Sequence, residues 1–513
     1  MDESIYKHIE LLLQYGLKNE LIEPIDYQYK KNAILEVLEI DQWEEPEIEC
    51  KELPDHPAEL LEPILDWAAS REMLFNDSVT FRDLFDTKIM ACFVPRPSVV
   101  IRDFYQTYEN DGPQKATKIF YEKSKKCHYI RMDRIRKNDD WKVNTDYGEL
   151  EITINLSKPE KDPAAIATAK SQKESTYPKC LLCKENVGYA GRIDHPARQN
   201  HRTIPVQLTE EMWHLQFSPY VYYKEHAIIF KNEHEPMKIS RKTFQRLLDF
   251  VERFPHYFIG SNADLPIVGG SILSHDHFQG GLHTFPMAEA KVEHAFELEE
   301  FPHVHAGIVK WPMSVIRIWG SDREQLISAA DSILHTWKGY SDPNAQVYAF
   351  TNGEPHNTVT PIARRRGEEY ELDIVLRNNI TSEKHPLGIF HPHRKVHHIK
   401  KENIGLIEVM GLAVLPGRLK KEIELLGRYL MMEEPLDLIK NDETVAKHTE
   451  WAASIIDKYE LLNGTNIKEV FQSEIGFIFS EILEYAGVFK RTPEGKHAFN
   501  RFIESIGTIN KTN

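Results

Sequence analysis

One short segment carries residue types that can do covalent chemistry. Residues 274–281 read Ser-His-Asp-His-Phe-Gln-Gly-Gly. On a β-strand alternate side chains point to one face, so His275, His277 and Gln279 would converge. An imidazole can be a nucleophile, a proton carrier or a metal ligand near pH 7, and a neutral amide can hydrogen-bond phosphoryl oxygens without giving up a proton. Apolar residues before the segment predict a buried strand, and glycines that permit close ligand approach flank it: Gly269, Gly270, Gly280 and Gly281.

A second candidate site begins at Cys180-Leu-Leu-Cys183. A lone Cys-x-x-Cys pair is half of a zinc site or a redox motif. The other cysteines are scattered along the chain, at Cys50, Cys92 and Cys127. A closed zinc site would therefore need two His from elsewhere, and the alternative is a pair of buried thiols without metal.

The His-x-His-x-Gln pattern resembles the active-site strand of the transferase branch of the histidine-triad superfamily. Hydrolases of that superfamily carry His-x-His-x-His, whereas its nucleotidyl transferases and phosphorylases carry Gln at the third position. The chain is most similar to the galactose-1-phosphate uridylyltransferase family, in its longer second class from some bacteria. The resemblance covers residues 175–420 by motif. The usual family motif is His-Pro-His-Gly-Gln, and this chain departs from it only at the two intervening positions.

The resemblance implies a catalytic segment of His275, His277 and Gln279. His277 matches the family's nucleophile, which would carry UMP as a phosphoramidate. Gln279 would hydrogen-bond the phosphoryl oxygens, where a His could donate a proton and favour hydrolysis. Three residues before this segment resemble the family's nucleotide-binding stretch and are predicted to bind substrate: Asn262, Gly270 and Ser271.

The resemblance also implies the ligands of a structural zinc ion. His234 and His275 match two family ligands, which would join Cys180 and Cys183. Such an ion would fix the strand that presents His277. The family's second, iron-type site has no residue-by-residue match in this chain.

Two further polar segments are candidates for substrate binding. Arg364 and Arg366 offer guanidinium groups suited to phosphates, and the alternative is a charged hairpin edge. The His-rich segment 391–398 is open to three interpretations: a second metal site, part of a sugar-phosphate pocket, or a polar loop.

Composition limits the function classes. The 513 residues include 63 Lys and Arg against 79 Asp and Glu, a net charge of −16, which argues against a nucleic-acid partner because no basic excess exists to displace counterions. No apolar run is long enough to span a membrane, and the N-terminus does not read as a signal peptide. Five cysteines do not form a disulfide framework, so we expect a cytoplasmic protein.

The predicted elements give an α+β fold with two tandem histidine-triad-like halves, antiparallel sheets and helical extensions. We predict a helical N-terminal extension over 1–147, a catalytic half over 148–312, a degenerate second half over 313–417 and a helical region over 418–513. Strands are predicted at 148–156 and 220–230, and helices at 240–254 and 323–340. In the second half, three residues are predicted to stand where the catalytic segment stands in the first: His356, Thr358 and Thr360.

The function implied is transfer of UMP from UDP-glucose to galactose 1-phosphate, giving UDP-galactose and glucose 1-phosphate. The kinetics would be ping-pong through His277, with no NAD requirement, and a homodimer is expected. The nearest alternative is a nucleotide phosphorylase of the same superfamily, which would accept inorganic phosphate. A non-enzymatic zinc- or nucleotide-binding scaffold is a more distant alternative.

Overall fold

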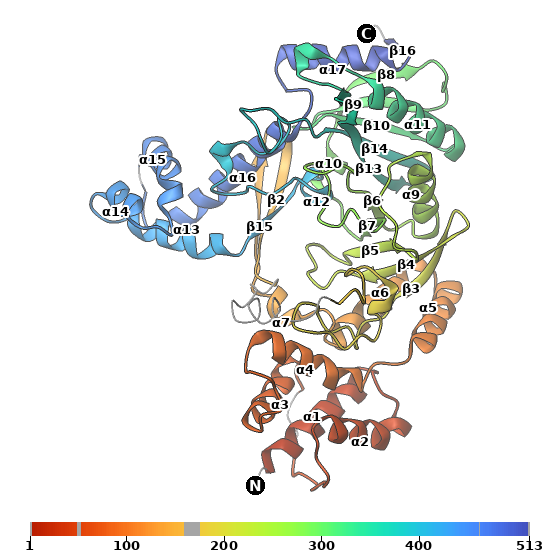
Figure 1. Cartoon of the computed structure of the whole chain (residues 1–513), viewed down its shortest axis with the longest axis vertical. Helices are drawn as coiled ribbons and strands as arrows, with labels where there is room; N and C mark the ends of the chain where they lie inside the picture. The colour runs from red at the N-terminus through yellow and green to blue at the C-terminus, as the bar shows by residue number, and fades with distance from the viewer. Residues whose placement is uncertain (1–2, 49–52, 158–174, 461, 511–513) are drawn as a thin grey trace. The chain divides into compact units, whose positions relative to one another are not determined.

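The computed structural model describes residues 3–48, 53–157, 175–460 and 462–510. The chain forms two compact units. Unit 1 is Met1–Lys137 with Ser157–Glu235, and unit 2 is Asn138–Leu156 with Pro236–Asn513. Both combine helices with mainly antiparallel strands (Figure 1), which confirms the predicted α+β class. The predicted domain boundaries after residues 147, 312 and 417 stay predictions.

Helices form the first part of unit 1, within the helical extension predicted over 1–147. Apolar residues at helical spacing are buried, as Ile9, Leu12 and Leu13 illustrate at 0% exposure. The helices are α1 (Glu3–Lys18), α2 (Tyr27–Val37), α3 (Ala58–Ser70), α4 (Val79–Ala91), α5 (Pro97–Asp111), α6 (Pro113–Lys126) and α7 (Met132–Ile135).

The strands of unit 1 pair in the antiparallel order β3-β4-β5. They are β3 (Ile204–Leu208), β4 (Glu211–Phe217) and β5 (Ala227–Lys231). The strand predicted over 220–230 is therefore wrong in its first part. Val221 and Glu225 have positive φ angles of 41° and 53°, which an extended strand does not permit.

The main sheet of unit 2 has the order β16-β8-β9-β10-β14-β13-β6-β7, with every pair antiparallel. Its strands are β6 (Phe258–Gly260), β7 (His277–Gly281), β8 (Val292–Leu298), β9 (His305–Val309), β10 (Val315–Gly320), β13 (Asn357–Arg366), β14 (Glu369–Asn378) and β16 (Thr508–Asn510). A small hairpin, β11 (Phe350–Thr351) and β12 (Glu354–Pro355), precedes β13.

Two long helices pack on this sheet, α9 (Arg241–Arg253) and α11 (Arg323–Gly339). Both were predicted from apolar stripes, and their inward residues are fully buried: Phe244, Leu247, Leu248 and Val251 in α9, and Leu326, Ala329, Ile333 and Trp337 in α11. Ser240 is the N-cap residue directly before α9, and its backbone N–H donates to Thr243 Oγ1 at 3.1 Å. Amphipathic spacing therefore predicted both helices correctly.

A smaller sheet and a helical arm complete unit 2. β1 (Asp139–Thr145) pairs antiparallel with β2 (Gly148–Asn155), which was predicted, and β15 (Leu412–Pro416) runs parallel to β2. The arm projects from the rest of unit 2 (Figure 1) and contains α13 (Arg418–Tyr429), α14 (Pro435–Asn441), α15 (Thr449–Lys458) and α16 (Ile467–Ala486). The remaining helices are α10 (Pro286–Glu289), α12 (Leu406–Val409) and α17 (Pro493–Ser505). Among the described residues, no helix has the length and apolar character needed to cross a membrane.

The predicted repetition of strand, helix and strand is present, but its residue alignment was wrong. The order β5, α9, β6, β7 recurs as β10, α11, β13, β14. By this order β14, not β13, is the counterpart of β7, the strand that carries His277 and Gln279. Thr358 and Thr360 lie on β13, and His356 directly precedes it, so these residues correspond to the neighbourhood of β6. Chain spacing alone could not separate two adjacent hairpin strands.

Candidate active site

The predicted catalytic segment lies at the start of β7. The strand begins at His277, and His275 lies in a bend just before it. The prediction of one shared strand face therefore holds for His277 and Gln279 and is wrong for His275. Asp276, between the two His, pairs with Arg246 of α9 at 3.1 Å, which ties the bend to the helix. The segment is buried as predicted, with exposures of 1% for His275 and 6% for His277.

A backbone hydrogen bond fixes the tautomer of His277. Its Nδ1 lies 2.8 Å from the carbonyl oxygen of His275. A carbonyl can only accept, so Nδ1 carries the hydrogen and the lone pair of the neutral ring is on Nε2. Burial lowers the pKa of His277 to about 4; the hydrogen bond to the His275 backbone acts in the opposite direction but is the smaller effect. The fold thus holds a neutral imidazole with Nε2 as its free basic atom.

Gln279 lies two residues along the strand, opposite a glycine. It pairs in register with Gly260 of β6. A Cβ at Gly260 would lie 2.8 Å from Leu406 Cδ1, so glycine is what lets the start of α12 pack against β6. Gln279 is half-buried. Its amide is therefore on the same strand face as the imidazole of His277.

Of the three residues predicted to bind nucleotide, Asn262 contacts the start of α12 and Gly270 packs against Asn262. Asn262 is buried, and its Oδ1 accepts the backbone N–H of Leu406 at 2.9 Å. A Cβ at Gly270 would lie 2.8 Å from Asn262 Nδ2, so only glycine fits against this amide. Ser271, one residue further, is exposed. These contacts order the loop before β7, and the predicted binding role of all three residues stays a prediction.

Arg364 belongs to a buried ion-pair cluster, which sequence reasoning missed. Arg364 pairs with Glu371 and, at 2.8 Å, with Asp373. Arg317 of β10 pairs with the same Asp373 at 2.6 Å. Arg366 lies at the margin, 3.5 Å from Glu371. The predicted phosphate-binding role of Arg364 and Arg366 is untested, and these internal carboxylate partners argue against it for Arg364.

Unit 1 contains a cluster of metal-ligand atoms. Cys180 Sγ lies 3.5 Å from Cys183 Sγ, and Cys183 Sγ lies 3.2 Å from His234 Nδ1. Two thiols and one imidazole within 4.8 Å of one another match the donor types of a structural zinc site. Burial raises the pKa of the Cys180 thiol to about 12, so a nearby cation is needed to hold it as a thiolate. His275, the predicted fourth ligand, belongs to unit 2.

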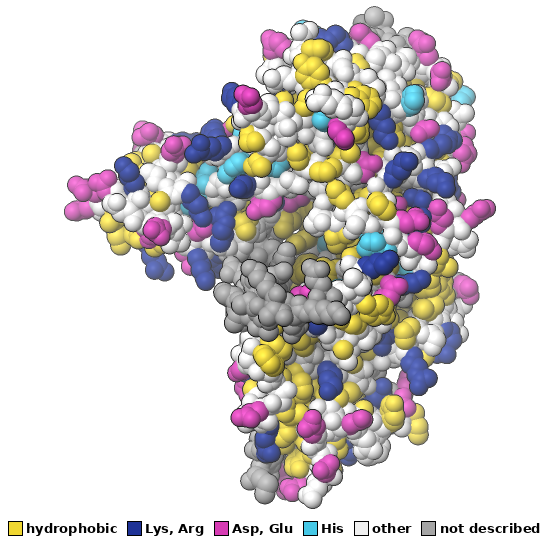
Figure 2. Space-filling view, viewed as in Figure 1, with side chains coloured by type: hydrophobic (Ala, Val, Ile, Leu, Met, Phe, Trp, Pro, Cys, Tyr) yellow, Lys and Arg dark blue, Asp and Glu magenta, His cyan; other side chains and the backbone are white. Residues whose placement is uncertain are grey.

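The His-rich segment 391–398 lies where the arm joins the rest of unit 2, and Figure 2 shows His side chains gathered there. Its last residue begins a chain of polar contacts. His398 Nδ1 lies 2.9 Å from His448 Nδ1, and His448 Nε2 lies 3.0 Å from Glu422 Oε2. The carboxylate only accepts, so a neutral His448 carries its hydrogen on Nε2 and accepts one from His398. Sequence reasoning could not find this chain of contacts, because the residues in its two pairs are 26 and 50 positions apart.

This contact chain predicts a loss of stability in acid. Burial, followed by the nearby His448, lowers the pKa of His398 to about 3. The unfolded side chain takes up a proton below about pH 6.5 while the folded one stays neutral, so the free energy of unfolding falls as the pH drops below 6.5. Between pH 7.5 and pH 5 the loss from His398 should be about 2 kcal/mol. The test is urea unfolding of wild type and His398→Asn at both pH values; Asn keeps a hydrogen-bond donor but cannot take up a proton. The drop in the free energy of unfolding between the two pH values should be smaller in the variant by this amount. An equal drop in both proteins would contradict the prediction.

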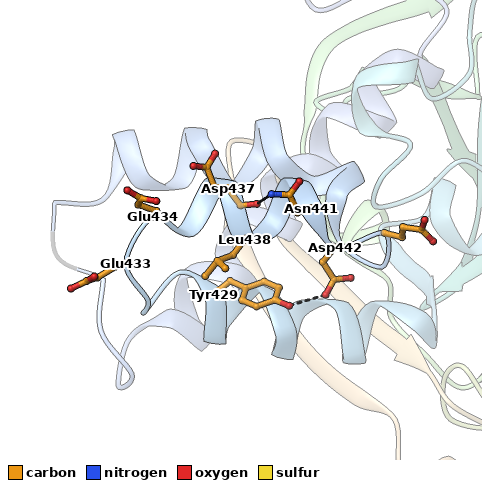
Figure 3. A pocket seen from close by; sticks show the side chains of 8 residues that line it. Tyr429, Glu433, Glu434, Asp437, Leu438, Asn441 and Asp442 are labelled. Atoms are coloured by element: carbon orange, nitrogen blue, oxygen red, sulfur yellow. Dashed lines mark hydrogen bonds between the residues drawn. The ribbon is translucent and has the colours of Figure 1, made fainter.

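The arm also has an acidic hollow of about 490 Å³ (Figure 3). Tyr429, Leu438 and Asn441 line it together with five acidic residues: Glu433, Glu434, Asp437, Asp442 and Glu443. The Tyr429 hydroxyl donates to Asp442 Oδ2 at 2.8 Å. None of the predicted site residues lies in this hollow, and its carboxylates would repel a phosphate.

Comparison with known proteins gives two family matches. The model described as "Galactose-1-phosphate uridyl transferase, N-terminal domain" matches residues 20–236, and the corresponding C-terminal domain matches residues 250–452. The galactose-1-phosphate uridylyltransferase of Halalkalibacterium halodurans is 59% identical over 506 residues, covering 98% of this chain and 99% of the relative. That of Bacillus subtilis is 57% identical over 508 residues, covering 98% of each chain. A crystal structure of yeast Ap4A phosphorylase Apa2 aligns with 10% identity and a TM-score of 0.31, over 64% of this chain and 88% of that one.

Proposed function

Since this chain belongs to the galactose-1-phosphate uridylyltransferase family, we propose that it transfers UMP from UDP-glucose to galactose 1-phosphate through a covalent intermediate on His277. The products are UDP-galactose and glucose 1-phosphate. The observation that carries the assignment of His277 is its hydrogen bond to the His275 carbonyl, which leaves Nε2 as the basic ring atom. The phosphorylase alternative is not favoured, since the relatives are named as uridylyltransferases.

The reaction is two displacements at one phosphorus atom. Nε2 of His277 attacks the α-phosphorus of UDP-glucose, a P–N bond forms, and the P–O bond to glucose 1-phosphate breaks. A phosphate oxygen of galactose 1-phosphate then attacks the same phosphorus, and the P–N bond breaks. The ring becomes positively charged in the intermediate, and the His275 carbonyl, which accepts from Nδ1, stabilises that charge. Splitting the transfer means that the two anionic sugar phosphates need not meet.

The direct test is to isolate the intermediate. Incubation with UDP-glucose labelled in the α-phosphate should give a protein-bound label that survives alkali and is lost in acid, as expected for a phosphoramidate. Peptide mapping should place it on His277, and galactose 1-phosphate should remove it as labelled UDP-galactose. Label on another residue would contradict the assignment of His277, and no covalent label would contradict the two-step mechanism.

Gln279→His should divert part of the reaction to hydrolysis. Gln279 shares the strand face of His277, and an amide there can hydrogen-bond the phosphoryl oxygens but cannot donate a proton as an acid. An imidazolium at this position could donate a proton and a positive charge to the phosphoramidate, and water, present at about 55 M, could then compete with the sugar phosphate. We expect slower sugar transfer and UMP release without acceptor, severalfold above wild type. A variant that forms the His277 adduct and releases no more UMP than wild type would show that Gln279 does not separate transfer from hydrolysis.

We further propose that Cys180, Cys183, His234 and His275 hold a structural zinc ion. The donor types fit, and the ion would fix the loop before β7 and take no part in bond making. Cys183→Ser and His234→Ala should each lower zinc content and melting temperature together, measured by atomic absorption and calorimetry. Cys92→Ser, outside the cluster, is the matched control. A metal-free wild type of full stability would refute the site.

The cytoplasmic location and the homodimer stay predictions from the sequence.

A further inference from the structure

One face of the unit 2 sheet carries both His277 and Arg377. Residues paired across β7, β6, β13 and β14 define this face: Gln279, Gly260, Ile362 and Asp373. His277 is two residues from Gln279, and Arg377 is four residues from Asp373. Because side chains alternate along a strand, both point to the same face as these paired residues.

Arg377 is a buried cation held only by neutral acceptors. Its side chain is 1% exposed. Nη2 donates to the carbonyl of Ile404 at 2.8 Å, Nη1 donates to Thr360 Oγ1 at 3.3 Å, and Nε has no hydrogen-bond partner. Within the described part of the chain, no carboxylate oxygen lies within 4.0 Å of the Arg377 guanidinium, the distance that defines an ion pair. A buried charge of this kind is costly unless an anion compensates it.

The other buried cations on this face have carboxylate partners. Arg317 and Arg364 share Glu371 and Asp373. Lys400, a buried cation outside the sheet, pairs at 3.0 Å with Glu408, and the charge of Glu408 also raises the pKa of Arg377. Arg377 therefore differs from its neighbours in lacking a carboxylate of its own.

The guanidinium of Arg377 reaches Thr360, which is level with His277 across the strands of the sheet. The observed pairings join Ile362 of β13 to Gly260 of β6, and Gly260 to Gln279 of β7; two residues further along, Thr360 is level with Asn262 and His277. The Ser261 N–H donates to the Pro361 carbonyl, which supports this extension of the β13–β6 pairing. Two strand spacings separate β13 from β7, so the charge at Thr360 is roughly 10 Å from the catalytic strand. Between them, residues 404–406 are held by Arg377 at Ile404 and by Asn262 at Leu406.

On the basis of the proposed function, we infer that Arg377 supplies a fixed positive charge that favours the anionic diphosphate of the nucleotide substrate at His277. Burial lowers the pKa of Arg377 to about 10, so the group remains charged at neutral pH. A positive charge at roughly 10 Å, with an effective dielectric constant near 20, should raise the affinity for a ligand that carries one negative charge about tenfold. A neutral nucleoside gains nothing from this charge.

The test compares an anionic with a neutral ligand. Binding of UDP and of uridine is measured by calorimetry for wild type, Arg377→Met, Arg377→Lys and Thr360→Val. We expect Arg377→Met to weaken UDP binding about tenfold and to leave uridine binding within about twofold. Arg377→Lys keeps the charge, and Thr360→Val removes only a hydrogen-bond partner, so both should retain UDP affinity within about threefold.

Equal weakening of UDP and uridine by Arg377→Met, or unchanged UDP binding, would overturn the inference and leave Arg377 as a structural clamp on Ile404. Arg377→Gln replaces Arg377→Met if the latter does not fold, and failure of both to fold while Arg377→Lys folds would likewise assign a structural role. The labelling of His277 in wild type is read separately. A labelled wild type with an unchanged ratio of UDP to uridine affinity refutes only the role of Arg377, whereas an unlabelled wild type refutes the proposed function.

Discussion

His277→Ala is expected to lose uridylyl transfer by about 10⁴-fold or more while it still binds UDP-glucose, because loss of a covalent nucleophile removes the bond on which both displacements depend. The methyl group that remains cannot attack phosphorus. Binding should survive, since the rest of the nucleotide site is unchanged. Initial rates of UDP-galactose formation measure the loss, and calorimetry with UDP-glucose measures the binding.

His283→Ala is the matched control for this experiment. His283 lies two residues beyond β7, is half-buried, and its Nε2 is 2.7 Å from Glu151 Oε2. It should keep most of the activity, because its partner is a structural carboxylate. If His277→Ala kept more than a few per cent of wild-type activity, His277 would not be the nucleophile.

Asp373→Ala is expected to lower the free energy of unfolding by about 3–5 kcal/mol, because it breaks a buried ion-pair cluster from one side. Asp373 is fully buried between Arg317 at 2.6 Å and Arg364 at 2.8 Å. Without it, the two guanidinium groups share Glu371 as their remaining carboxylate in the cluster. Urea unfolding followed by circular dichroism measures the effect.

Glu289→Ala is the control for this variant. Glu289 is 66% exposed and lies 3.5 Å from Arg366 at the margin of the same cluster. A surface pair of this kind contributes about 0–1 kcal/mol, so the control should be close to wild type. A loss for Asp373→Ala as small as that of the control would mean that the stability of the buried cluster does not depend on Asp373.

The elements that the sequence predicted correctly depend on local patterns. The helices α9 and α11 follow from apolar residues at helical spacing, and Ser240 marks the start of α9. The Cys-x-x-Cys pair is brought together by its own short turn, and the family resemblance added His234. His277 and Gln279 share a face because any strand alternates its side chains.

The tertiary structure decided what depends on pairing between distant segments. The order of the strands in the chain and in the sheet showed that β14 is the counterpart of β7, because adjacent hairpin strands have similar alternation and only their neighbours distinguish them. It also gave Arg364 a carboxylate from β14 and left Arg377 without one, although both are arginines on neighbouring strands. The sequence by itself thus determined which residue types stand close together along the chain and which of them are candidates for the chemistry. The three-dimensional pairing decided which charges are neutralised, since hydrogen bonds and ion pairs across a sheet join residues that no local pattern connects.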